Sequence, residues 1–560
     1  MAKKKTSSAV HTIDGQSLKR LAQAGLTWLE TNYEHVNSLN VFPVPDGDTG
    51  TNMLLTMRSA LSEIQQSEDT HAGRVASKIY NGALMGARGN SGVILSQIWR
   101  GFARGIETEE LIDADGLRRG FAEAARTAYK AVQEPVEGTM LTVIREVSEE
   151  AGAITQNTDD LAQILEHLVE RSRDAVRRTP TMLKVLKDAG VVDSGGMGMT
   201  YILEGMLRHA RGEVLAMDQV ALSSNALQDA LEPEDEEGYG YDVQFLLKGE
   251  SLDVPAVRDH IESIGWSALV VGDENIIKVH VHVHNPGEVL GYGADLGALD
   301  DIVVENMQAQ YEHFVAERGA PGSGSNHDSM PPEPPEIEEG TIAAVTVAPG
   351  EGLARIFYSL GAGRVVSGGQ TMNPSTKDLL EAVDTLPTDR VVILPNNKNI
   401  LMSAEQAAEA ATGNGKDVRV VATRTIPQGI SALLALDPAG DLDEVVSSMD
   451  EFASMVETGE VTTSTRDVTI NGLEVREGQI IGLHNDQLTA AGDDVNSVVQ
   501  ELLKQMRADE MELITLYYGE DVTHEQAHAL VDVLATIYPD HEVELREGGQ
   551  AHYFYILSAE

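Results

Sequence analysis

Residues 39–57, LNVFPVPDGDTGTNMLLTM, constrain the fold more than any other stretch of this 560-residue chain. Pro43 and Pro45 fix their own φ and disfavour helical backbone in the residues before them, so this part cannot be helical. The glycine between Asp46 and Asp48 permits a sharp turn of the backbone. The segment therefore predicts a stiff loop that presents two carboxylates.

A helix is expected directly after this loop. Thr49, Thr51 and Asn52 are of residue types that cap helix N-termini, and apolar residues follow at helical spacing. A helix N-terminus suits phosphate, and neighbouring carboxylates suit Mg²⁺. We therefore expect a metal–nucleotide site. The alternative is that Asp-Gly-Asp forms only a solvent-exposed turn, as Asp and Gly often do.

The charge of the chain limits its partners. It has 89 acidic and 41 basic residues, a formal net charge of −48. Such a surface repels nucleic acid and anionic membranes, so neither is expected as a direct partner. The chain lacks cysteine, which fits a cytoplasmic protein without disulfides. The N-terminus lacks the apolar core of a secretory signal, and no apolar run approaches the roughly 18–20 residues of a membrane span.

Residues 14–212 read as an all-α domain. Helical patterns recur with short connections between them, which indicates a closed bundle of about eight helices. After the first helix, which ends before residue 40, the expected ranges are 53–67, 70–86, 91–105, 109–133, 139–152, 159–177 and 196–211.

Three loops of this domain combine glycine with a Ser, Thr or Asn at a helix start. They are GARGNSG at 86–92, EGT at 137–139 and DSGG at 193–196. This combination can hold phosphate through backbone N–H groups. None is a Walker A loop or a strand-linked GxGxxG motif, so the P-loop and Rossmann interpretations fail on context. Each loop alone could be a tight helix–helix turn, but together with the aspartate loop they favour a nucleotide site.

Residues 213–237 are polar, acidic and unpatterned, and read as a linker. Residues 238–318 form a small α/β domain with the order β-α-β-β-α-β, which is that of a ferredoxin-like fold. Within it, the sequence KVHVHVH alternates strictly and places His280, His282 and His284 on one face of a strand. Two such imidazoles can bind a metal, for which zinc is the ordinary choice. The alternative is a polar solvent-exposed face.

Residues 319–340 form a second linker, rich in Gly, Ser, Pro and acidic residues. Residues 341–560 alternate strand and helix patterns, which predicts a parallel sheet covered by helices, followed by a second α/β part. The loops at 367–375 and 395–399 follow strands of this sheet, at the edge where ligands commonly bind. We expect a ligand or partner surface there. The alternative for Asn373, Pro374 and Ser375 is that they only start a helix.

The motifs together carry a resemblance that no single one does. In chain order they are NVFPVPDGDTGTNM, GARGNSGVILSQ, EGTMLTV, VVDSGG, GYGYDVQF, KVHVHVHNPG, SGGQTMNPS and LPNNKNI. This series resembles the catalytic subunit of bacterial fatty acid kinases, the ATP-binding half of a two-component kinase, over residues 14–560. The resemblance implies an N-terminal helical barrel like the DhaL nucleotide-binding subunit of dihydroxyacetone kinases and a C-terminal α/β domain of the DegV type.

Site residues follow from this resemblance by position. Asp46 and Asp48, with Asn40 as a further ligand, match the residues that hold Mg²⁺. The middle-domain metal ligands of the family are a cysteine and two histidines, which fall on Asp242, His280 and His282 here. The residues expected to line the ATP site are Thr49, Thr51, Asn52, Gly89, Asn90, Ser91, Gly92, Gly138, Thr139, Asp193 and Gly195.

The resemblance also implies the reaction. The expected acceptor is the carboxylate of a fatty acid held by a DegV-like lipid-carrier protein, and the product is an acyl phosphate. The C-terminal domain is expected to dock the carrier, and the family leads us to expect a homodimer. Two alternatives remain: a kinase for dihydroxyacetone or a similar small polyol, and an adaptor that binds nucleotide without catalysis.

Overall fold

The structure is a computed structural model that describes most of the chain. The described residues are 10–40, 47–132, 134–213, 241–249, 252, 254–272, 276–283, 285–306, 334–335, 337–369, 373–470 and 473–560. The predicted proline loop before Asp48, Asp46 included, lies outside these ranges, as do His284, most of the first linker and much of the second. Within the described ranges, no helix is long and apolar enough to cross a bilayer.

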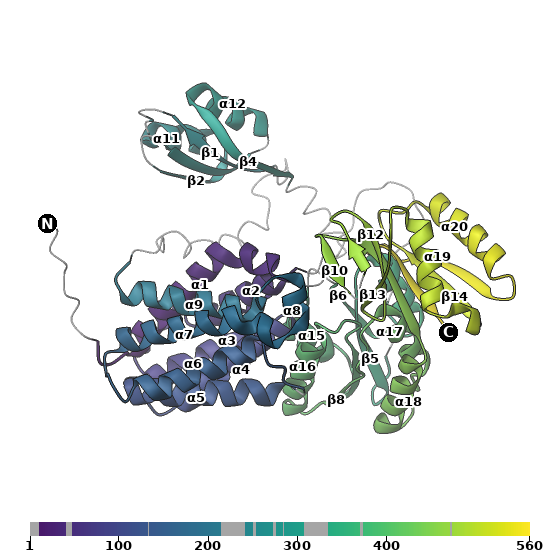
Figure 1. Ribbon diagram of the computed structural model, residues 1–560, viewed down its shortest axis with the longest axis horizontal. Helices are drawn as coiled ribbons and strands as arrows, with labels where there is room; N and C mark the ends of the chain where they lie inside the picture. Colours follow the sequence, from purple (N-terminus) through teal and green to yellow (C-terminus); the bar gives the residue numbers. More distant parts are fainter. Residues whose placement is uncertain are drawn as a thin grey trace. The chain divides into compact units, whose positions relative to one another are not determined.

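The N-terminal segment is helical throughout, as its periodicity predicts (Figure 1, purple to blue). Its long helices pack their apolar faces around one continuous core. Its elements are α1 (Gly15–Ser38), α2 (Thr49–Ser62), α3 (Ala72–Met85), α4 (Gly89–Gly105), α5 (Ala114–Ala131), α6 (Met140–Ile154), α7 (Leu161–Met182), α8 (Lys184–Ala189) and α9 (Ser194–Ala210).

Several helices of this bundle begin at side chains that satisfy their first N–H groups. Asp14, Asp113 and Asp160 accept hydrogen bonds at the starts of α1, α5 and α7, respectively. The sequence did not predict the short α8. It also placed the start of the fifth helix too early, because residues before α5 pair instead with the N-terminal segment through an Ile13–Ile112 bridge.

The middle segment has the predicted βαββαβ order. It comprises β1 (Tyr241–Lys248), α11 (Val254–Ile264), β2 (Trp266–Gly272), β3 (Ile276–Val283), α12 (Pro286–Leu296) and β4 (Ala298–Asn306). The strands lie in the order β2-β3-β1-β4, with every neighbouring pair antiparallel. This is the arrangement of a ferredoxin-like sheet. Val279, Val281 and Val283 are buried in its core, as the alternation predicts.

The C-terminal segment begins with the predicted parallel sheet, in the strand order β6-β5-β7-β8. The strands are β5 (Ile342–Ala348), β6 (Arg364–Ser367), β7 (Arg390–Leu394) and β8 (Asp417–Val420), and the helices are α14 (Glu351–Ser359), α15 (Thr376–Asp384), α16 (Leu401–Gly413), α17 (Ile426–Leu434) and α18 (Leu442–Ser454). Alternate side chains of β5 enter two cores, one with α15 and α16 and one with α14 and α17. Helices therefore cover both faces of the sheet.

A second, six-stranded sheet follows, in the order β13-β12-β9-β16-β14-β15 (Figure 1, green to yellow). Helices α19 (Val495–Gln505) and α20 (His524–Ile537) pack on one face of it. Its strands are β9 (Glu457–Thr463), β12 (Ile480–His484), β13 (Gln487–Gly492), β14 (Leu513–Tyr518), β15 (Glu542–Glu547) and β16 (Tyr553–Ala559); β10 (Val468–Ile470) and β11 (Leu473–Val475) form a separate hairpin. Strands β14 and β15 pair in parallel, whereas the other neighbouring strands of this sheet pair antiparallel.

The helical segment and the C-terminal segment form one compact unit, whereas residues 218–328 form another. Helix α16 lies against α4, and Met85 at the end of α3 packs on the core beneath α15 and α16. The layer formed by α15 and α16 therefore lies between the parallel sheet and the N-terminal bundle. This contact brings a C-terminal loop to the predicted nucleotide site.

Candidate functional site

Asp48 is buried at the start of α2. The residue is 7% exposed, and its side chain makes no capping hydrogen bond to its own helix. Its Oδ2 instead accepts a hydrogen bond of 2.5 Å from Nδ2 of Asn373, a residue of the C-terminal segment that is 1% exposed. Thr49 beside it donates its hydroxyl to Oδ1 of Asn40 at 2.8 Å. Asp48 is thus a desolvated carboxylate rather than part of a solvent-exposed turn.

Helix α2 is capped from outside its own sequence. Oδ1 of Asn37, in the last turn of α1, accepts the N–H groups of Gly50 and Thr51 at 2.7 and 3.2 Å. Its Nδ2 donates to the Thr51 hydroxyl at 3.0 Å. The expected cap residues therefore do not cap α2 with their side chains, and Thr51 is engaged by Asn37. Two of the first N–H groups of α2 are consequently not available to a ligand.

Helix α4 begins without a side-chain cap among the described residues. Its first residue, Gly89, has φ +56°, and a Cβ there would lie 2.5 Å from Nδ2 of the buried Asn52. Only glycine fits such a position without strain. Ser91 donates its hydroxyl to the carbonyl oxygen of Thr49 at 3.5 Å. The N-termini of α4 and α2 are therefore adjacent, and that of α4 lacks a side-chain cap, which leaves its first N–H groups as candidates for binding an anion.

The starts of α6 and α9 meet in the same way. The Asp193 carboxyl caps α9 by accepting the Gly196 N–H at 2.7 Å, and it also accepts from the Met140 N–H at the start of α6. Thr139 caps α6 through the Leu141 N–H. Ser194 then donates to the Thr49 hydroxyl at 3.3 Å. These contacts connect α6 and α9 to the start of α2.

Four helix N-termini, those of α2, α4, α6 and α9, therefore converge beside Asp48. Each carries a partial positive charge of about half a unit. The sequence predicted this group of loops, and the structure brings Asn40, Thr49, Ser91, Thr139 and Asp193 into it through the contacts above. Other predicted residues lie in the same loops: Gly92 follows Ser91, buried Gly138 (φ +87°) precedes Thr139, and Gly195 follows the α9 cap.

Burial raises the pKa of the Asp193 carboxyl from 3.8 to about 6, against the lowering effect of its two backbone hydrogen bonds. Because this pKa is higher in the folded state, its stabilising contribution is complete below about pH 4 and is lost as the pH rises through about 6. Asp193→Asn keeps the cap but cannot ionise. We expect the variant to gain about 1.4 kcal/mol of stability relative to wild type between pH 5 and 7.5, because the wild-type loss over this window corresponds to about one pH unit below the folded-state pKa. Urea unfolding at both pH values measures this gain; a pH-independent difference would contradict it.

The sequence did not predict that a C-terminal residue would contact Asp48. The loop at 367–375 had equal support as a ligand surface and as a helix cap. The structure shows the cap, because Ser375 forms a capping box with Asp378 at the start of α15, and it shows that Asn373 contacts Asp48 of the same chain. A ligand or partner surface in this loop stays a prediction. Arg88, before the start of α4, donates to the carbonyl oxygen of Asn373 at 2.8 Å. The motif SGGQTMNPS marked this loop as a candidate functional segment, but the sequence could not show that the loop lies next to Asp48.

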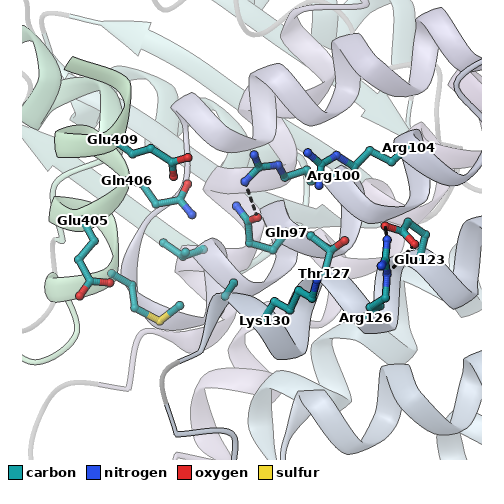
Figure 2. A pocket seen from close by; sticks show the side chains of 13 residues that line it. Gln97, Arg100, Arg104, Glu123, Arg126, Thr127, Lys130, Glu405, Gln406 and Glu409 are labelled. Atoms are coloured by element: carbon teal, nitrogen blue, oxygen red, sulfur yellow. Dashed lines mark hydrogen bonds and ion pairs between the residues drawn. The ribbon is translucent and has the colours of Figure 1, made fainter. Parts of the chain in front are cut away.

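A separate cavity of about 320 Å³ lies between α4, α5 and α16 (Figure 2). Basic side chains of α4 and α5, among them Arg100, Arg104 and Lys130, line one side, and Glu405 and Glu409 of α16 line the other. None of the predicted site residues lines it. The opposed charges favour the contact between the two segments, and the cavity lacks the glycine loops and helix starts that surround Asp48.

In the middle domain, the structure places the predicted metal residues in backbone register. Asp242 of β1 is paired with His282 of β3, and Gln244 is paired with His280. Asp242 and His282 are therefore direct cross-strand neighbours, and His280 is two residues away along the same strand. No cluster of three or more potential metal ligands occurs among the described residues; Asp46 and His284, and the side chains of Asp242, His280 and His282, lie outside that description.

Comparison with known proteins identifies all three segments. Residues 343–560 match the C-terminal domain model of the FakA-like fatty acid kinase subunits, residues 238–314 match the middle-domain model of the same subunits, and residues 43–208 match the DAK2 domain. The models cover these segments in the chain order that the motifs suggested. They support a kinase that uses ATP.

An uncharacterised protein of Staphylococcus aureus strain MRSA252 is 38% identical over 98% of this chain and all of its own length. Two solved structures are more distant. Dihydroxyacetone kinase of C. freundii has a TM-score of 0.32 and 15% identity, over 40% of this chain and 48% of its own. A DegV family protein of Thermus thermophilus, described as binding fatty acid, has a TM-score of 0.28 and 18% identity, over 39% of this chain and 99% of its own. The chain belongs to the FakA-like family of fatty acid kinase subunits.

Proposed function

We propose that this protein transfers the γ-phosphoryl group of ATP to the carboxylate of a fatty acid held by a separate carrier protein, giving an acyl phosphate. The observation that carries the proposal is the convergence of four helix N-termini beside the buried carboxylate of Asp48, in a member of a fatty acid kinase family. The positive ends of the helices suit the polyphosphate, and the carboxylate suits its metal ion.

The start of α4 is the part of this site that receives phosphate oxygens. The helix has no side-chain cap, and its first residue, the left-handed Gly89, lies against Asn52 and Asn373. By contrast, Asn37 already occupies two N–H groups of α2, and Asp193 occupies N–H groups of α9 and α6. Helices α2, α6 and α9 therefore contribute mainly their dipoles.

The residues around Asp48 fit Mg²⁺. The side-chain oxygens of Asp48 and Asn40 are hard ligands of the kind that Mg²⁺ prefers, and the sequence predicts Asp46 as a second carboxylate. Asn373 adds a buried carbonyl oxygen, Oδ1, that accepts no hydrogen bond from the described residues. When bound, Mg²⁺ neutralises charge on the phosphates.

The chemistry requires little proton transfer. A carboxylate oxygen of the fatty acid forms a bond to the γ-phosphorus, while the bond from that phosphorus to the β,γ-bridging oxygen breaks and ADP leaves with the electron pair. The acceptor is already ionised at neutral pH, so no general base is needed. The barrier is repulsion between the anionic acceptor and anionic ATP, which the helix N-termini reduce by stabilising charge on the transferred group.

The acceptor reaches the site on a partner protein in this proposal. The family name designates one component of a fatty acid kinase, so a second, fatty-acid-carrying component of DegV-like type is expected. We assign its docking to the C-terminal domain, which contacts the Asp48 site through Asn373. We assign dimerisation to the middle domain.

A second proposal concerns metal in the middle domain. The backbone pairing of Asp242 with His282, and the position of His280 two residues along the same strand, support this proposal. One oxygen and two nitrogen ligands are a set that zinc accepts. Elemental analysis should find about one zinc per chain in wild type and none in His282→Ala. Equal zinc content in the two proteins would reject the site.

The kinase proposal is tested by incubating the purified protein with Mg²⁺, ATP labelled in the γ-phosphate, and a fatty-acid-loaded carrier protein. We expect label in an acyl phosphate, dependent on both the carrier and its fatty acid. Labelling of dihydroxyacetone instead would favour the small-polyol kinase. Nucleotide binding without transfer to either acceptor would favour an adaptor.

A further inference from the structure

A short segment of the C-terminal domain is built into the nucleotide site. Asn373 donates to Asp48, and the N–H of Thr376 donates to the carbonyl oxygen of Ala87 at 3.1 Å. Arg88 and Ser375 form an isolated backbone bridge. The segment thus contacts both the carboxylate and the loop before α4 through side chain and backbone.

Charge reinforces this contact. The Arg88 guanidinium lies 3.4 Å from the Asp378 carboxylate and also donates to the carbonyl oxygen of Asn373. Asp378 in turn accepts the N–H of Ser375 in the capping box of α15. The position of Asn373 is therefore fixed from both sides, by the start of α15 and by the loop before α4.

The side chain of Asn373 is only partly satisfied. An ionised carboxylate only accepts hydrogen bonds, so the contact with Asp48 must use the amide nitrogen, Nδ2. The carbonyl oxygen, Oδ1, is buried and accepts no hydrogen bond from the described residues, and the same holds for Oδ1 of Asn90, next to Gly89. A buried acceptor left unpaired costs about 1–3 kcal/mol. Next to a carboxylate, such an oxygen suits a cation or its bound water rather than a phosphate oxygen.

We propose that Asn373 is a positioning residue through which the C-terminal domain completes the metal–nucleotide site. Nδ2 holds the Asp48 carboxylate in place through the hydrogen bond to its Oδ2. Oδ1 of Asn373 faces the metal ion or a water bound to it. Groups that orient a metal ligand in this way typically change metal affinity by about 10- to 100-fold. The inference rests on the proposed function, since it assumes that Asp48 binds the metal of a metal–nucleotide complex.

A blocking role for Asn373 would change the metal-dependent affinity in the opposite direction. If the amide of Asn373 occupied the lone pair that the metal needs, it would block the site, and its removal would strengthen binding. A purely structural role would weaken metal-bound and metal-free nucleotide binding alike. The dependence of nucleotide affinity on metal therefore separates the three roles.

The test is calorimetric titration of the full-length protein with a non-hydrolysable ATP analogue, once with Mg²⁺ and once with EDTA. For Asn373→Ala we expect an affinity loss of about 10- to 100-fold with Mg²⁺ and less than about a twofold change without it. Gln550→Ala removes a buried side-chain amide of the same domain, from a residue that is 1% exposed and donates to the carbonyl oxygen of Tyr517, and should change neither affinity. Asp378→Asn keeps a side-chain oxygen for the Ser375 N–H but loses the charge that pairs with Arg88. It should show a smaller loss with the same dependence on Mg²⁺.

Unchanged or tighter binding of the Mg²⁺ complex by Asn373→Ala would overturn the inference, as would equal losses with and without Mg²⁺. Should Asn373→Ala fail to fold, Asp378→Asn provides the same comparison. If wild type itself does not bind the Mg²⁺ complex, the proposed function fails. If wild type binds and Asn373→Ala behaves like wild type, only the inference about Asn373 fails.

Discussion

Replacing Asp48 by asparagine should abolish phosphoryl transfer and leave the fold intact. The substitution removes the charge of a residue that is 7% exposed and lies where four helix N-termini meet. It nearly preserves shape, and the new amide oxygen can still accept the hydrogen bond from Asn373. Loss of a single electrostatic stabiliser commonly lowers kcat by about 10²–10³-fold, and we expect at least this much. Initial rates of transfer from labelled ATP, with the melting temperature alongside, measure the effect.

Asp113→Asn is the matched control for this change. Asp113 caps α5 by accepting the Gly116 N–H at 2.8 Å, and asparagine caps helices about as well as aspartate. We expect its rate to equal that of wild type. On sequence grounds Asp46→Asn should behave like Asp48→Asn. A large fall in the melting temperature of Asp48→Asn, in parallel with its activity, would show that the carboxylate serves stability rather than transfer.

Gly89→Ala should remove most of the nucleotide affinity. Gly89 has φ +56°, and an added Cβ would lie 2.5 Å from Nδ2 of Asn52 and 3.4 Å from Nδ2 of Asn373. Asn52 is 4% exposed, so its side chain has little space into which to turn away from the added Cβ. The start of α4 must therefore shift, and its N–H groups with it. A loss of about 1.4 kcal/mol or more, equivalent to at least tenfold in Kd, is expected in a nucleotide titration.

Gly190→Ala separates this clash from backbone strain. Gly190 lies at the end of α8 with φ +68°, and an added Cβ would meet no atom within 4 Å. The substitution should cost about 1–2 kcal/mol of stability from the left-handed backbone alone and leave nucleotide affinity unchanged. Equal nucleotide affinities in Gly89→Ala and Gly190→Ala would contradict the assignment of the α4 start as the phosphate-binding element.

The sequence predicted most of the fold because local patterns determine it. Three sequence patterns correspond to the predicted elements in the structure. They are the helical periodicity of the N-terminal segment, the alternation around Val281 and the β-branched runs of the parallel sheet. The βαββαβ order also implied the correct strand arrangement, since few arrangements join that order without crossed connections. Helix ends were less predictable, because tertiary contacts such as the Ile13–Ile112 bridge end or delay a helix.

The site was only partly predictable for the same reason. Local sequence patterns predicted Asp48 and Gly89: Asp48 is a carboxylate before a capped helix, and Gly89 is a glycine at a helix start. Asn37 and Asn373 do not, because their roles depend on partners 13 and 325 residues away. An asparagine is chemically able to cap, orient or ligate, and only its neighbours in space decide which of these it does.

The most direct measurement is a crystal structure of the full chain with Mg²⁺ and a non-hydrolysable ATP analogue. The predicted result places the β- and γ-phosphates against the first backbone N–H groups of α4, with Mg²⁺ between them and the Asp48 carboxylate. A nucleotide bound elsewhere, for example in the cavity beside Arg100 and Glu409, with the start of α4 empty, would contradict the proposed site and the kinase mechanism built on it.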